Sequence, residues 1–101
     1  MTSKVAVLNF TSPDSKPVNV DAAKFHAAKA ALVASAPSSP PGFKIADLQL
    51  NAKALLPQDL FPGGATAGWW FKCVQLDMEA RGEMKRSATS PLHLWLTKKE
   101  N

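Results

Sequence analysis

Three side chains in this sequence have the reactivity that nucleophilic or acid–base catalysis requires: Cys73, His26 and His93. A nucleophile needs a base within hydrogen-bonding distance and a third group that orients the base. Cys73 is expected in the middle of an aromatic strand, where apolar surroundings raise the pKa of a thiol and leave it inert. Asp77 and Glu79 share a face of the same strand, but no pocket-forming glycines accompany them. We therefore predict no catalytic residue and a protein that is not an enzyme.

Metal and cofactor sites are not expected either. One cysteine and two histidines at these spacings fit no four-ligand zinc motif. Residues 5 to 10, Val-Ala-Val-Leu-Asn-Phe, resemble the first strand of ParA-type nucleotide-binding ATPases, but the loop at residues 11 to 17 lacks the glycines that wrap a phosphate. The single cysteine excludes an intrachain disulfide and favours a reducing compartment, the cytoplasm. We predict no metal, no cofactor and no nucleotide site.

Aromatic and basic side chains occur together in the last third of the chain. The candidate binding residues are Trp69, Phe71, Lys72, Arg81, Lys85, Arg86 and Trp95. Flat rings can stack on exposed bases while nearby cations contact phosphates. The formal charge of +4 and the isoelectric point near 9.5 also favour an anionic partner. Our first hypothesis is a small non-catalytic protein that binds single-stranded nucleic acid.

A protein partner is the alternative. Asp77, Glu79 and Glu83 lie among the cations, and protein interfaces combine a desolvated aromatic centre with a polar rim of mixed charge. The same aromatic face would then belong to a protein–protein interaction module or inhibitor of the kind that phages and mobile elements encode. It could equally pair two copies of the chain as a homodimer.

The clearest local signal is a helix that begins after Asp21. Asp21 is a good N-cap, and Val20 with Phe25 occupies the two positions of a hydrophobic staple. Alanine-rich sequence continues to about Ser35, where the proline-rich segment 37–42 ends the helix. Residues 4 to 10 before it are predicted to form a strand.

The remaining elements are predicted as strands and loops. Residues 43 to 52 fit both the strand and the helix period, and we assign them as a strand. Residues 36–42 and 57–68 are loops, and strands at 69–80 and 92–97 form an antiparallel hairpin around a loop at 81–91. The fold class is therefore α+β, with one main helix and one mixed or antiparallel sheet of about four strands, in the order β-α-β-β-β.

These elements place the three aromatic candidates on one face of the predicted sheet. In a strand that starts at Trp69, alternate residues put Trp69 and Phe71 on one face, beside Trp95 of the neighbouring strand. The chain length fits a single domain, 1–101, with frayed ends at 1–3 and 99–101. No apolar run approaches the roughly 18 residues that a membrane-spanning helix needs, so we expect no membrane partner.

Overall fold

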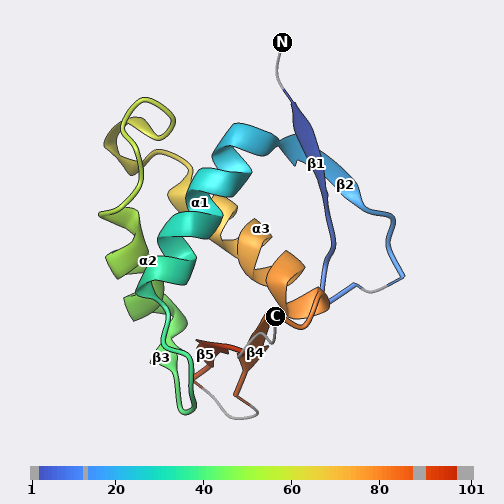
Figure 1. Cartoon of the computed structure of the whole chain (residues 1–101), viewed down its shortest axis with the longest axis vertical. Coiled ribbons are helices and arrows are strands. Elements are labelled where there is room, and N and C mark those ends of the chain that lie inside the picture. Colours follow the sequence, from blue (N-terminus) through green and yellow to red (C-terminus); the bar gives the residue numbers. More distant parts are fainter. Residues whose placement is uncertain (1–2, 13, 88–90, 98–101) are drawn as a thin grey trace.

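Helix α1 forms where the sequence places its start signals. The computed structural model describes residues 3–12, 14–87 and 91–97, and α1 spans Ala22–Ser35 (Figure 1). The Asp21 carboxylate accepts a hydrogen bond from the Ala23 N–H at 3.0 Å, which caps the helix. Val20 and Phe25 are both buried, as the staple requires. The predicted helix and its cap are confirmed.

The amino-terminal strand belongs to a two-stranded hairpin. Strand β1 (Lys4–Val7) pairs antiparallel with β2 (Val18–Asp21), which sequence analysis did not predict. Val5 lies opposite Val20 and Val7 opposite Val18, so these four valines share one face of the hairpin. Because a two-stranded ribbon is not stable alone, this valine face must pack against another element.

The segment predicted as the strongest strand is a helix. Helix α3 spans Ala67–Ala80 and buries one face, so the strand prediction for 69–80 is wrong. Its buried apolar residues follow the helical spacing i, i+3, i+4, i+7 and i+11: Ala67, Trp70, Phe71, Val74 and Met78. Aromatic and β-branched residues favour strands, but the burial of this helical face outweighs that preference.

The second sheet is small and antiparallel. Strand β5 (His93–Leu96) lies between β3 (Phe43–Lys44) and β4 (Met84–Arg86), so β5 pairs with β4 and not with residues 69–80. The predicted strand at 43–52 consists of β3 followed directly by helix α2 (Ile45–Lys53). Leu48 and Ala52, the helix-spaced pair in this ambiguous segment, are the buried residues of α2.

These elements form one α+β domain, which confirms the predicted class. The described residues hold three α-helices and two antiparallel sheets, in place of one main helix and one sheet. Helix α1 packs on α2 and α3, and α3 runs between α2 on one side and the β1–β2 hairpin on the other (Figure 1). Segment 36–42 has no helix or strand, and 57–66 contains one 3-10 turn, η1 (Pro62–Gly64). The ends 1–2 and 98–101 lie outside the described residues.

Candidate functional site

A groove of about 550 Å³ lies between the β1–β2 hairpin and the exposed face of α3. We call it the hairpin groove. It is lined by Val7, Leu8, Asn9, Ser15, Lys16, Val18, Val20, Gly68, Trp69, Lys72, Cys73 and Leu76. Ligand pockets in proteins typically measure about 300–1,000 Å³, so this groove has the size of a binding site.

The side-chain spacing of a helix and of a strand explains which residues form the two walls of the hairpin groove. Trp69, Lys72 and Cys73 stand at positions i, i+3 and i+4 of α3, on the side that faces away from the core. The opposite wall is the valine face of the hairpin, which is buried at Val20 but 60% exposed at Val18. The hairpin therefore covers only part of α3 and leaves the remainder open to a ligand.

Trp69 supplies the flat apolar surface of the groove. Its residue surface is 60% exposed, and its ring meets the ring of Trp70 edge-on at 4.9 Å. Trp70 is buried and in turn lies edge-on to Phe61 at 6.4 Å. Such edge-to-face contacts are favourable. The exposed indole thus rests on a row of buried rings that reaches the core, which holds it in place for stacking.

The charges in the hairpin groove all have one sign. Lys16 and Lys72 are both exposed, and the described residues that line the groove include no carboxylate. Lys72 was a candidate from the sequence together with Trp69, whereas Lys16 was not, because only the folding of the hairpin brings it close. This arrangement suits an anionic ligand with a flat apolar part.

Five of the seven predicted binding residues do not line the groove, and three of these are Phe71, Trp95 and Lys85. Phe71 is 1% exposed in the core, because on a helix it faces away from Trp69 and cannot stack on a ligand. Trp95 is partly buried on β5, where its ring packs over Gly42. Lys85 is exposed on β4 and does not line the groove. The single aromatic face expected from the strand prediction does not form.

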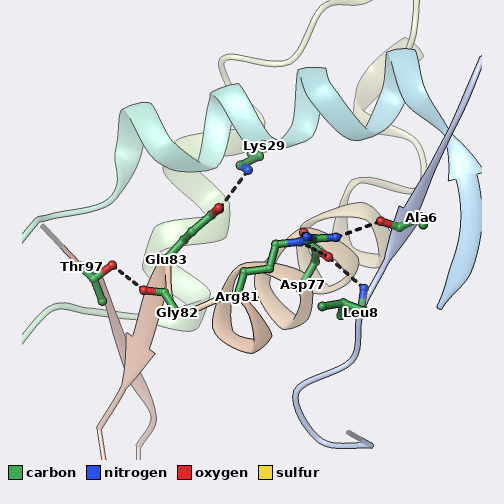
Figure 2. A network of polar contacts seen from close by, with 8 residues as sticks. All are labelled: Ala6, Leu8, Lys29, Asp77, Arg81, Gly82, Glu83 and Thr97. Atoms are coloured by element: carbon green, nitrogen blue, oxygen red, sulfur yellow. Dashed lines mark hydrogen bonds and ion pairs between the residues drawn. The ribbon is translucent and has the colours of Figure 1, made fainter. Parts of the chain in front are cut away.

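Arg81 is part of a contact that fastens the hairpin to α3 (Figure 2). Its Nε donates to the Asp77 carboxylate at 2.9 Å, and its Nη2 donates to the Ala6 carbonyl at 3.2 Å. The same carboxylate accepts the Leu8 N–H at 2.8 Å. The Ala6 carbonyl and the Leu8 N–H point away from β2, on the outer edge of β1. Arg81 and Asp77 therefore cover this edge at those two backbone groups.

Arg86 is likewise paired inside the protein. Its guanidinium forms an ion pair with Glu79, whose side chain is 1% exposed and also accepts a hydrogen bond from Gln75 at 2.9 Å. Glu83 pairs with Lys29 at 3.0 Å (Figure 2). The mixed charges that sequence analysis assigned to an interface are therefore joined in internal pairs.

Cys73 is the reactive side chain of the hairpin groove. Partial burial, and then the negative charge of Asp77, raise the pKa of its thiol above the ordinary value. A thiol in such surroundings is a poor nucleophile at neutral pH. Within residues 3–12, 14–87 and 91–97, no three His, Cys, Asp or Glu side chains group closely enough to hold a metal ion.

We expect the alkylation of Cys73 by iodoacetamide to require higher pH in the folded protein than in the unfolded chain. A raised pKa means less thiolate at any given pH, so the midpoint of the rate profile moves upward on folding. The measurement is the alkylation rate between pH 7 and pH 10 with and without denaturant. If the pH midpoint of alkylation in the folded protein were equal to that of the unfolded chain, or lower, the apolar and acidic surroundings assigned to the thiol would be wrong.

Comparison with known proteins places the chain in a family. Residues 4–94 match the model of a family of unknown function, DUF6958. No curated protein and no solved structure matches the chain significantly. Of the described helices, none is both long and apolar enough to cross a membrane. The match at 4–94 covers most of the length of the chain, so the protein belongs to the DUF6958 family, a family of unknown function.

Proposed function

We propose that this protein is a non-catalytic binding protein that takes a single strand of nucleic acid in the hairpin groove. The observation that carries the proposal is the exposed Trp69 indole, which shares a groove with Lys16 and Lys72 and with no described carboxylate. Proteins that bind single strands combine stacking rings with cations that follow the backbone. A cytoplasmic location, which the single cysteine favours, is part of this proposal.

The position of the acidic residues favours nucleic acid over a protein partner. The protein hypothesis depended on Asp77, Glu79 and Glu83 lying among the cations of an interface. Each of these carboxylates instead pairs with a cation of the same chain, and none of the three lines the groove. The mixed-sign rim that the protein hypothesis required is absent from the groove lining, and a groove with cations alone attracts phosphates, so the charge pattern matches a phosphate backbone better.

Replacing Trp69 with leucine is expected to weaken the binding of a fluorescein-labelled oligothymidylate about 5- to 150-fold, the range of one base–aromatic stack. Trp69→Phe keeps a flat ring and should retain most of the affinity. Lys72→Gln should lower the slope of log affinity against log salt by about 0.7, one phosphate contact on a single strand. Fluorescence anisotropy at several salt concentrations measures both effects.

Lys85→Gln is the matched charge control. It removes one exposed lysine outside the hairpin groove, so it should leave the affinity and the salt slope close to those of the original protein. Equal losses in Lys72→Gln and Lys85→Gln would mean that binding is only a response to net charge. Absence of binding at low salt, together with a dimer in sedimentation that Trp69→Leu dissociates, would reject nucleic acid and support the protein alternative.

A further inference from the structure

A second hollow adjoins the hairpin groove at the start of α3. It measures about 390 Å³, lies between α2 and the first residues of α3, and includes Gln49, Lys53, Thr66 and Gly68 in its lining. We call it the α2–α3 hollow. Gly68 lines both hollows, so the two are separated at that point only by a residue without a side chain.

The α2–α3 hollow repeats the charge pattern of the hairpin groove. Lys53 is its one charged residue among the described residues that line it. The stem of Lys53 passes so close to Gly64 that a Cβ added there would lie 2.3 Å from Lys53 Cε. The lysine is thereby supported along its length by the backbone of the loop before α3. Its stem packs against the loop while the residue as a whole remains exposed, as is usual for a long cationic side chain.

We propose that the two hollows form one track, and that a bound strand passes Trp69, crosses α3 at Gly68 and enters the α2–α3 hollow, where Lys53 contacts a further phosphate. This inference rests on the proposed function and defines the length of strand that the protein recognises. It is carried by the shared Gly68 and by the presence of lysines, without carboxylates, in both described linings.

Gly68 allows the track to be blocked without disturbing the fold. A Cβ built at this position meets no atom within 4 Å, so the space above it is open. Gly68 lies in the first turn of α3, where a residue other than glycine also favours the helix. Gly68→Leu should therefore place a side chain across the track, while Gly68→Ala adds only a methyl group.

The test compares oligothymidylates of about 3 and about 12 nucleotides, one below and one within the range of about 4–16 nucleotides that single-strand sites commonly cover. We expect Lys53→Gln to weaken the longer strand about 3- to 10-fold and to lower its salt slope by about 0.7, with no effect on the shorter strand. Gly68→Leu should weaken the longer strand by at least as much. Gly68→Ala and Lys44→Gln, an exposed lysine outside both hollows, are the matched controls.

The outcomes separate the two proposals. If Trp69→Leu weakens both oligonucleotides while Lys53→Gln and Gly68→Leu change neither, the track is overturned and the hairpin groove stands as the whole site. If Lys44→Gln matches Lys53→Gln, the contact at Lys53 is not specific and the track is also overturned. If neither oligonucleotide binds, the proposed function fails and the track with it.

Discussion

Replacing Arg86 with methionine is expected to lower the free energy of unfolding by about 3 kcal/mol, the lower end of the cost of breaking a buried ion pair. The side chain of Glu79 is 1% exposed, and Arg86 supplies its neutralising charge. Without the guanidinium, the carboxylate loses its paired charge and retains the hydrogen bond from the Gln75 amide. The guanidinium also lies over the Phe10 ring at 5.0 Å, a contact that methionine replaces only in part. Urea denaturation at pH 7 measures the loss.

The double variant Arg86→Met with Glu79→Gln is the control for this prediction. It removes both charges, and a buried pair that is replaced as a whole often costs little. We therefore expect it to recover most of the lost stability. A loss below about 1 kcal/mol for Arg86→Met alone would place this pair among solvated surface pairs. It would also return Arg86 to the phosphate-binding role that sequence analysis assigned to it.

Replacing Asp77 with alanine is expected to cost about 2–3 kcal/mol and to release the β1–β2 hairpin from α3. The carboxylate is 3% exposed and accepts hydrogen bonds from both Arg81 and the Leu8 N–H. A bond to a charged acceptor contributes about 1.5–3 kcal/mol, and the Leu8 N–H would lose its partner. The Arg81 side chain is 42% exposed and can bind water instead, so its lost bond adds little. Because the hairpin is one wall of the hairpin groove, the affinity for oligothymidylate should fall as well.

Amide hydrogen exchange shows which segments the Asp77→Ala substitution loosens. Exchange in the segment 3–12 and in β2 should accelerate more than exchange in α1, since local release of the hairpin differs from global unfolding. Asp77→Asn retains an amide oxygen that can accept from Leu8, so it should loosen the hairpin less. Equal acceleration in all segments would show that Asp77 contributes only to overall stability and does not position the groove wall.

The parts of the fold that could be predicted were those with local signals. The helix α1 follows from the Asp21 cap and the Val20–Phe25 staple, which lie within a few residues of each other. The α+β class follows from alternating strand and helix signals. Strand β2 was missed because Pro17 and short polar residues precede it, and its pairing with β1 supplies the stability that its own sequence lacks.

The strand prediction for α3 shows where the sequence was ambiguous. Residues 69–80 alternate, but they also repeat at helical spacing, and no proline or glycine interrupts them. A run of 12 residues exceeds the usual length of a strand, so length favoured the helix and should have decided the assignment. The wrong period placed Phe71 on the outer face beside Trp69, whereas on α3 it is 1% exposed.

The candidate site was predictable only in part. Trp69 and Lys72 were both candidates because aromatic and basic residues occur together in this segment, but a strand would put them on opposite faces. They share the groove because positions i and i+3 of a helix lie on one face. Lys16 is more than 50 residues away in sequence and enters the groove through the hairpin's contact with α3. Arg81 and Arg86 were assigned to phosphates since the sequence did not reveal that buried carboxylates occupy them.

The contacts of Asp77 and Arg81 with the outer edge of β1 affect how readily another chain can add a strand there. An exposed strand edge is a template on which further chains can add, and hydrophobic valine-rich strands are especially prone to this. Here two charged side chains of a helix occupy the backbone groups that an incoming strand would need, at Ala6 and Leu8. Two of the outward groups of this edge are thus occupied without a third strand, which leaves fewer groups on this valine-rich segment for fibrillar polymerisation to use.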